Sequence, residues 1–390
     1  MNTITELRKF VAPEIIMGVD ARIMIGRYIG HFASKRPMIV TDRNLEALPW
    51  FADILSEFEK YDICPVIFND VTSNPREYEV MQGAEMFLDY KCDLIIAIGG
   101  GSPIDCAKGI SIVSSNGGEI LDYEGVDEIN LPGPPLIAIP TTSGASADVS
   151  QFAIICDTSN HVKKAIISKK VVPDLALIDP VPLMTMDLYL TACTGMDALT
   201  HAMEAYVSNA NSQLTDIHAI EAIRLINATI EDAVKPDRTI EIMYEMMLGS
   251  LHAGLAFSNA SLGAVHAMAH SLGGLLDLPH GECNSLLLEH VVNLNFEVAS
   301  EKYTEIAKVM GLDVDGLGPE VVKENLLNRL KVLRKKLGIN DYAIVEELDD
   351  KLLDKLAEGA LLDPCIVTNP RMLSLKEVTT VYGQILRKKR

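Results

Sequence analysis

Four side chains in the second half of the chain have the types and the spacing of a single metal site: Asp197, His201, His266 and His280. They occur in two short stretches, TGMDALTHAMEAY at 194–206 and GAVHAMAHSLGGLLDLPHGE at 263–282. One carboxylate and three imidazoles suit a first-row transition metal such as Fe²⁺ or Zn²⁺ far better than Ca²⁺ or Mg²⁺. The sequence therefore predicts one site for a divalent transition metal.

Spacing within the two stretches supports a shared site. Asp197 and His201 are four residues apart, as are His266 and His270, so each pair shares one face of a helix. One such pair alone is more typical of an ordinary helix, but two pairs with His280 favour metal binding. His270 would lie one turn beyond His266. With an ordinary pKa of about 6.5 it could shuttle a proton, or it could only pack beside the ligands.

A metal held in this way suits the activation of an oxygen atom. Four protein ligands with room for one more allow Lewis-acid activation of an alcohol or a carbonyl, with hydride passing to or from a nicotinamide. One carboxylate among neutral imidazoles leaves an Fe²⁺ site with a net charge of about +1, which suits a developing oxyanion. A metallopeptidase is disfavoured because HAMAH at 266–270 lacks the glutamate base of HExxH.

Strands and helices alternate through the first half of the chain. Nearly continuous apolar runs are typical of strands that are buried on both faces of a parallel sheet. The strands are predicted at 37–42, 64–70, 92–100, 134–142 and 173–180, and helices are predicted at 44–60 and 75–90. This pattern predicts an α/β domain over residues 1–183.

The second half of the chain has helical periodicity and few strand signals. The predicted helices are 188–207, 212–235, 239–257, 260–276, 285–311, 319–337, 347–361 and 374–388. We therefore expect an all-α metal-binding domain over residues 184–390, with the active site in the cleft between the two domains.

The loop GGGSPID at 99–105 follows a buried strand and opens a helix. Gly99, Gly100 and Gly101 allow a tight turn and close approach of a ligand, and a helix N-terminus there would attract an anion. Ser102 could cap the helix, and Asp105 could complete a capping box. The spacing is not GxGxxG, so the loop alone fits an ordinary tight turn as well as a phosphate site.

A second loop, PTTSGASADVS at 140–150, follows another predicted strand. It could offer Thr141, Thr142 and Ser146 to a phosphate or a nicotinamide, or it could be a solvated loop. Two such loops at strand ends favour a ligand, since open parallel sheets bind ligands there. Asp42 ends an earlier strand and could accept hydrogen bonds from a ribose or cap a helix. Because Asp42 precedes the glycine loop, the fold is Rossmann-like with a non-standard fingerprint order.

Composition narrows the class of protein. The chain has 390 residues, 48% of them hydrophobic, and a formal net charge of −20. This acidity disfavours nucleic acids and anionic membranes as partners. The seven cysteines are scattered without a CxxC pair, which is typical of a reducing compartment. There is no signal pattern and no apolar run of membrane-spanning length, so we expect a cytoplasmic protein.

These segments together resemble the iron-containing (group III) alcohol dehydrogenase family over essentially the whole chain. The similarity begins at FVAPEIIMG (10–18) and IVTDRNL (39–45), and it continues through AIGGGSPIDCAKGI (97–110) and PTTSGASAD. The most specific segments are GMDALTHAMEAY and GAVHAMAH with its downstream PHG, and the similarity closes with DPCIVTNPR at 363–371.

The resemblance implies particular roles for these positions. The metal ligands are Asp197, His201, His266 and His280, while His270 matches a non-ligand histidine that faces the substrate and the nicotinamide. GGGSPID and the threonine-rich loop match contacts to the pyrophosphate and the nicotinamide.

The resemblance also implies the cofactors, which are NAD and Fe²⁺, with Zn²⁺ as the other metal that this ligand set accepts. Asp42 matches the residue that favours NAD over NADP, because a carboxylate repels a 2′-phosphate. Asn74 falls at a cofactor-contact position, and Lys163 or Lys164 matches more loosely. The family architecture is similar to that of dehydroquinate synthase.

The resemblance implies an NAD-dependent alcohol dehydrogenase or aldehyde reductase that acts on a small primary alcohol or aldehyde, and we expect a homodimer or a larger homo-oligomer. Departures occur in the second loop, where Ala145 and Asp148 replace a threonine and a glutamate. A dehydroquinate-synthase-type lyase remains an alternative, but residues 190–290 lack its cluster of basic residues. A protein that binds NAD and metal without catalysis is a third possibility.

Overall fold

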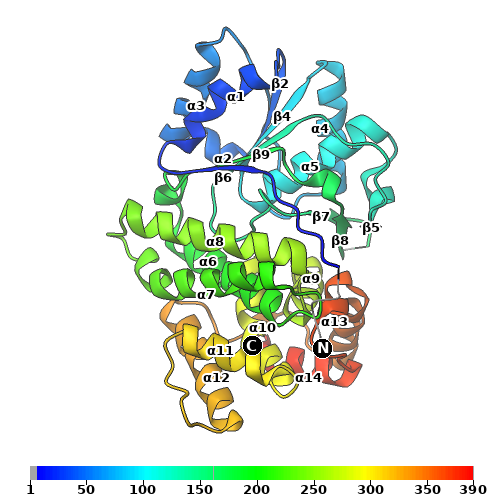
Figure 1. Ribbon diagram of the computed structural model, residues 1–390. Helices are drawn as coiled ribbons and strands as arrows, with labels where there is room; N and C mark the ends of the chain where they lie inside the picture. The colour runs from blue at the N-terminus through cyan, green and yellow to red at the C-terminus, as the bar shows by residue number, and fades with distance from the viewer. Residues whose placement is uncertain (1–6, 161, 390) are drawn as a thin grey trace. The chain divides into compact units, whose positions relative to one another are not determined.

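The computed structural model describes residues 7–160 and 162–389, and contacts divide the chain into two compact units (Figure 1). One unit comprises Val11–Met186 and Thr239–Met247. The other comprises the segment up to Phe10, Asp187–Arg238 and the chain from Leu248 onward. None of the described helices has the length and apolar character needed to cross a membrane. All seven cysteines are free thiols.

The first unit is built on a six-stranded parallel sheet in the order β1-β9-β6-β4-β2-β3. Its strands are β1 (Glu14–Met17), β2 (Pro37–Val40), β3 (Val66–Phe68), β4 (Leu94–Gly99), β6 (Leu136–Pro140) and β9 (Leu175–Ile178). All five predicted strands are present, and β1 is an additional edge strand. The order of strands along the chain reverses between β2 and β4, so the carboxyl ends of these two strands flank the topological switch point.

Helices cover both faces of this sheet, as Figure 1 shows for α1 and α3 on one side and α4 and α5 on the other. Their bounds are α1 (Ile25–His31), α2 (Arg43–Glu46), α3 (Pro49–Glu59), α4 (Glu77–Asp89) and α5 (Gly101–Asn116). Successive residues of β4 serve opposite faces: Leu94 packs in a core with α1 and α3, and Ile95 packs in a core with α4 and α5. This alternation explains why the strands are apolar without a break.

The first unit also contains a small sheet that the sequence analysis did not predict. It consists of β5 (Gly125–Val126), β8 (Val162–Ile167) and β7 (Phe152–Asp157) in that order, with β7 and β8 antiparallel. At the end of β7, the Asp157 carboxylate accepts hydrogen bonds from the backbone N–H groups of Ser159 and Asn160. This local hydrogen bonding favours the turn that returns the chain as β8.

The second unit is helical, which confirms the predicted class. Its helices are α6 (Leu188–Val207), α7 (Gln213–Ala233), α9 (Ala264–Leu276), α10 (His280–Asn295), α11 (Ser300–Val309), α12 (Pro319–Lys336), α13 (Asp350–Leu362) and α14 (Leu375–Ile385). Helix α8 (Ile240–Ala260) contributes residues to both units. Side-chain caps start several of these helices; Asp187, for example, accepts hydrogen bonds from the first N–H groups of α6.

One element of this unit departs from the all-helical prediction. Strands β10 (Ala343–Val345) and β11 (Leu386–Lys388) pair in parallel to form a two-stranded sheet. The β11 segment was predicted as the end of a helix, but α14 stops at Ile385. Strand β10 lies more than 40 residues before β11 along the chain, so helical periodicity near residue 385 gives no indication that the two strands pair.

Candidate functional site

The four predicted metal ligands converge within the helical unit. Asp197 and His201 lie one turn apart on α6, His266 lies in the first turn of α9, and His280 is the first residue of α10. The Asp197 Oδ1 atom lies 3.9 Å from His201 Nε2, 3.6 Å from His266 Nε2 and 3.8 Å from His280 Nε2. The ligand atoms of Asp197, His201 and His266 lie within 4.8 Å of one another, and His280 approaches the same carboxylate oxygen from a third helix.

This donor set fits a divalent transition metal. Tetrahedral ligands about 2.1 Å from a metal lie about 3.4 Å apart, close to the observed separations. Burial raises the pKa of Asp197, but the facing imidazoles lower it more, so the pKa lies well below its usual range and the carboxylate is charged. Burial lowers the pKa of His266, while hydrogen bonding to Asp197 and Glu204 raises it to about 9. The field at His266 thus favours a positive charge.

Glu204 fixes the orientation of one imidazole. Its Oε2 atom lies 2.6 Å from His266 Nδ1, and its Oε1 atom accepts a 2.6 Å hydrogen bond from the Val265 N–H. A carboxylate at Nδ1 keeps the imidazole oriented with Nε2 toward Asp197. The sequence analysis missed this role. The available signal was a buried glutamate seven residues after Asp197, on the same face of α6.

His270 lies beside the four ligand side chains. Its ring stacks on His280 with centroids 5.3 Å apart, and its Nδ1 atom lies 2.8 Å from Asp363 Oδ2. Burial raises the pKa of Asp363, but His270 and further hydrogen bonds lower it below its ordinary value. Asp363 also accepts a hydrogen bond from the Cys365 N–H, so the carboxylate that contacts His270 is itself held. Asp363 was another residue without a predicted role.

An aromatic ring completes one side of the cluster. Phe257 on α8 stacks on His201 with centroids 4.2 Å apart, and His201 stacks on His266 at 4.5 Å. Stacked rings restrict the rotation of these imidazoles, which helps to keep their nitrogen atoms directed at one point.

The predicted cofactor residues lie at the carboxyl edge of the main sheet. Asp42 follows β2, the glycine loop follows β4, and the second loop follows β6, which are neighbouring strands around the switch point. The N–H of Thr141 donates a 3.0 Å hydrogen bond to the Gly99 carbonyl, which joins the two loops. This edge is where open parallel sheets bind ligands.

The two loops are packed tightly against one another. A Cβ atom on Gly100 would lie 3.0 Å from the Thr142 side chain, and one on Gly101 would lie 2.9 Å from Ala145 Cβ. Glycine at these positions is therefore required by close packing. It also leaves the N-terminus of α5 unobstructed by side chains of its own, as an anion site requires.

Helix α5 begins differently from the prediction. Gly100 is the N-cap and Gly101 the first helical residue, so the predictions of a Ser102 cap and of an Asp105 capping box are wrong. Ser102 Oγ instead accepts a 3.1 Å hydrogen bond from the Asn74 N–H. Asp105 accepts one from the Ile154 N–H. Both side chains are used to join separate segments, because the glycine turn places the helix start two residues earlier.

Asn74 is the centre of a further cluster. Lys163 on β8 donates a 2.8 Å hydrogen bond to Asn74 Oδ1, and Asn74 adopts a left-handed backbone conformation with φ of 58°. With the Ser102 contact, three of the predicted cofactor residues, Asn74, Ser102 and Lys163, form one connected group.

Three other predicted residues have local partners. Asp42 accepts a 2.9 Å hydrogen bond from the Asn44 N–H and is the N-cap of α2. Thr141 and Ser146 are buried, and Ser146 Oγ donates to the Gly144 carbonyl. The cap role that the sequence left open for Asp42 is therefore present, and it uses one carboxylate oxygen.

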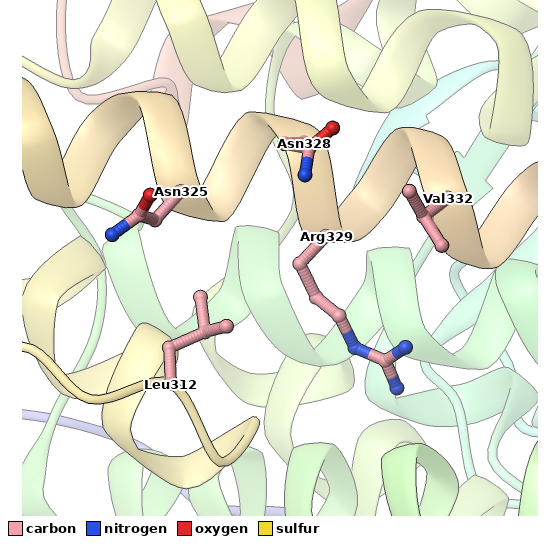
Figure 2. Close-up of a pocket in the computed structure, with 5 residues that line it drawn as sticks. All are labelled: Leu312, Asn325, Asn328, Arg329 and Val332. Carbon is pink, nitrogen blue, oxygen red and sulfur yellow. The ribbon is translucent and has the colours of Figure 1, made fainter.

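A separate pocket of about 200 Å³ lies on the helical unit (Figure 2). Figure 2 shows Asn325, Asn328, Arg329 and Val332 projecting from α12 around Leu312. The Arg329 guanidinium already contacts Glu231 Oε1 at 3.1 Å and Asn227 Oδ1 at 2.8 Å. Its charge is compensated, and none of the lining residues is a predicted site residue.

Comparison with known proteins identifies the family. The model of the C-terminal part of the Fe-containing alcohol dehydrogenase family matches residues 191–386, and the iron-containing alcohol dehydrogenase model matches residues 12–180. The chain belongs to the iron-containing alcohol dehydrogenase family.

Individual relatives of this alcohol dehydrogenase cover almost its full length. It is 37% identical to 1,3-propanediol dehydrogenase of Citrobacter freundii, over 96% of this chain and 98% of that protein. It is 33% identical to NAD-dependent methanol dehydrogenase of Bacillus methanolicus, over 97% and 99%. The solved alcohol dehydrogenase of Oenococcus oeni superposes with a TM-score of 0.93 at 32% identity, covering 97% of this chain and all of that one.

These relatives confirm the predicted fold and the predicted class of activity. The chain is an oxidoreductase that interconverts alcohols and aldehydes with NAD, and its family implies Fe²⁺ as the metal.

Proposed function

We propose that this dehydrogenase interconverts a small primary alcohol and its aldehyde at a metal held by Asp197, His201, His266 and His280. The observation that carries the proposal is the convergence of one carboxylate oxygen and three imidazole nitrogens from three helices. The names of two relatives, which refer to 1,3-propanediol and methanol, support a short alcohol as substrate.

The chemistry is divided between bound groups and side chains. A divalent cation in this site supplies Lewis-acid stabilisation of negative charge on the substrate oxygen. Asp197 offsets part of the cation's charge, and the Glu204–His266 contact keeps one imidazole oriented. Phe257 excludes water from one side of the histidine cluster.

We infer that His270 carries the alcohol proton. Asp363 accepts the Nδ1–H hydrogen bond, which leaves His270 Nε2 as the atom that takes a proton from the substrate and returns it to solvent. Because His270 packs beside His280 without joining the predicted ligand set, it can exchange a proton while the metal ligands stay in place.

The α/β unit is proposed to bind NAD. The N-terminus of α5, with Gly99, Gly100 and Gly101, would hold the pyrophosphate through backbone N–H groups. Further contacts come from residues at the same sheet edge or joined to it: Asp42, Asn74, Ser102, Asp105, Thr141, Thr142, Ser146 and Lys163. The Asp42 carboxylate favours NAD because it would repel the 2′-phosphate of NADP.

We further propose a division of tasks along the chain, with residues 1–183 binding the dinucleotide and residues 184–390 binding the metal. Hydride transfer requires the nicotinamide and the substrate at the metal to meet at one active site. The scattered cysteines and the acidic composition support a cytoplasmic protein. We also infer a homodimer or a larger homo-oligomer, which size-exclusion chromatography with light scattering would test.

The central experiment is anaerobic purification followed by metal analysis and a screen of short alcohols and aldehydes with NADH and NADPH. The expected result is about one Fe²⁺ or Zn²⁺ per chain and NADH-dependent reduction of a short aldehyde. Metal-replete protein that consumes no NADH across a broad panel of aldehydes would contradict the proposed function.

A further inference from the structure

Asn284 reaches three of the four ligand side chains. It lies on α10 four residues after His280, hence on the same helix face, and its side chain is fully buried. Its Nδ2 atom donates a 2.6 Å hydrogen bond to Asp197 Oδ1 and lies 3.1 Å from His266 Nε2 and 3.2 Å from His280 Nε2. The amide therefore contacts atoms of the proposed ligand set.

The contact with Asp197 limits how that carboxylate can turn. The oxygen that accepts from Asn284 is the same Oδ1 atom that lies closest to the imidazole nitrogens. An amide nitrogen only donates hydrogen bonds, so it selects acceptor atoms that direct a lone pair toward it. The Asp197 Oδ1 atom meets this condition and keeps a second lone pair for a cation, whereas an imidazole Nε2 atom has a single lone pair.

The other end of the amide has no comparable role. Asn284 Oδ1 is buried and has no hydrogen-bond partner among the described residues. An unpaired buried carbonyl oxygen is unfavourable, and an apolar side chain of similar shape would carry no such penalty. Packing alone therefore does not account for an asparagine, whereas the contacts of its nitrogen with the ligand atoms do.

We propose that Asn284 is a positioning residue of the metal centre, which holds Asp197 Oδ1 toward the imidazole nitrogens and so strengthens the binding of a divalent cation. This inference rests on the proposed ligand set. Residues that orient metal ligands through hydrogen bonds typically contribute about 10- to 100-fold to metal affinity.

The test measures Co²⁺ binding to the full-length protein by competition with a chelator, together with the visible absorption of the bound Co²⁺. The variants are Asn284→Leu, which keeps the branched shape without the polar atoms, and Asn284→Ala, which relieves any crowding. Ser285→Ala is the matched control, because Ser285 is the next residue of α10 and its buried hydroxyl has no partner among the described residues. Circular dichroism and Tm report whether each variant folds.

The expected result is a fall in Co²⁺ affinity of about 10- to 100-fold in both Asn284 variants, with a changed absorption spectrum and little effect of Ser285→Ala. Folded Asn284 variants that bind Co²⁺ within about twofold of the parent, with the parent spectrum, would overturn the inference. The parent and His280→Ala are measured in parallel. Failure of the parent to bind Co²⁺, or parent-like binding by His280→Ala, would instead contradict the proposed metal site.

Discussion

The proposed metal centre and the cofactor edge of the sheet differ in what they are built from, which is side chains in one and mainly backbone in the other. Side chains make the proposed metal centre: one carboxylate and three imidazoles project from helices, and the four-residue spacing of Asp197 and His201 is visible in the sequence. The cofactor edge consists largely of backbone, with glycines that allow two loops to pack and that begin helix α5. Substitutions should therefore affect metal retention in the first region and cofactor affinity in the second.

The largest effect is expected from His280→Ala. This change removes one of four donor atoms, so metal content and activity should fall together, by more than about 100-fold in metal affinity. Metal analysis and NADH-linked rates measure both quantities. Because His280 lies in the helical unit, NADH binding measured by fluorescence should change little; a metal-replete, fully active variant would refute its assignment as a ligand.

A smaller loss of metal affinity is expected from Glu204→Gln. The amide keeps the size of the side chain but replaces the carboxylate that orients His266, so affinity should fall by about 10- to 100-fold. Chelator competition measures this change. Glu241→Gln, at an exposed position in the first turn of α8, is the control and should retain the parent affinity.

The cofactor edge can be tested separately with Gly101→Ala. The new Cβ atom would lie 2.9 Å from Ala145 Cβ and push the two loops apart, so KM for NADH should rise by about tenfold while metal content stays unchanged. Gly30→Ala is the matched control in the same unit, because no atom lies within 4 Å of its added Cβ. A loss of metal in Gly101→Ala without a rise in KM would contradict the assignment of metal binding and cofactor binding to separate regions.

Cofactor choice should respond to Asp42→Asn. Asparagine retains the cap of α2 and removes the charge that opposes a 2′-phosphate, so the ratio of kcat/KM for NADPH to that for NADH should rise by about tenfold. The Tm should stay near the parent value, since the capping hydrogen bond is kept. An unchanged ratio would show that Asp42 only caps the helix.

The smallest effects concern stability, and they should have opposite signs in the two units. In the helical unit, burial lowers the pKa values of His218 and His252, whose Nδ1 atoms lie 2.9 Å apart. In the α/β unit, burial raises the pKa values of Asp105 and Asp148 to about 6. As the pH falls from 7, the unfolded histidines take up protons near pH 6.5 before the folded ones, which removes stability.

The buried carboxylates behave in the opposite way. They bind protons in the folded protein near pH 6, above the unfolded value of about 4, so acidification to pH 5 adds stability. Thermal unfolding at pH 7.0 and 5.0 with saturating metal measures both effects. Relative to the parent, His252→Gln should lose less Tm on acidification, and Asp148→Asn should lose more. An equal change in Tm between pH 7.0 and 5.0 for the parent and both variants would contradict the opposite effects expected for the histidines and the carboxylates.

The helix spacing, the apolar strands and the glycine loop made most of the fold predictable, together with the clustering of Asp197, His201 and His266. Asp197 and His201 are four residues apart and therefore share one face of an α-helix, so their closeness follows from the local sequence alone. The contacts of Glu204, Asn284 and Asp363 depend on how several helices pack, and one sequence contains no direct record of that packing. These three residues were therefore found only in the structure.

The errors in the first unit have a related cause. The start of α5 was misplaced because Ser102 and Asp105 match common capping residues, whereas a glycine turn begins the helix earlier. Strands β5, β7 and β8 form a separate small sheet. Their pairing brings Lys163 to Asn74 across 89 positions of the chain, a distance over which periodicity has no predictive value.

The Glu204 carboxylate has two partners, His266 Nδ1 and the backbone N–H of Val265 in the first turn of α9. The N-cap of α9, Gly263, offers no side chain, so the glutamate on α6 takes over the capping of another helix. Exchange of the Val265 amide hydrogen with solvent requires its hydrogen bond to the Glu204 carboxylate to break. Fraying of α9 and release of the imidazole are thus coupled through one carboxylate, and slow amide exchange at Val265 is expected while Glu204 is held in place.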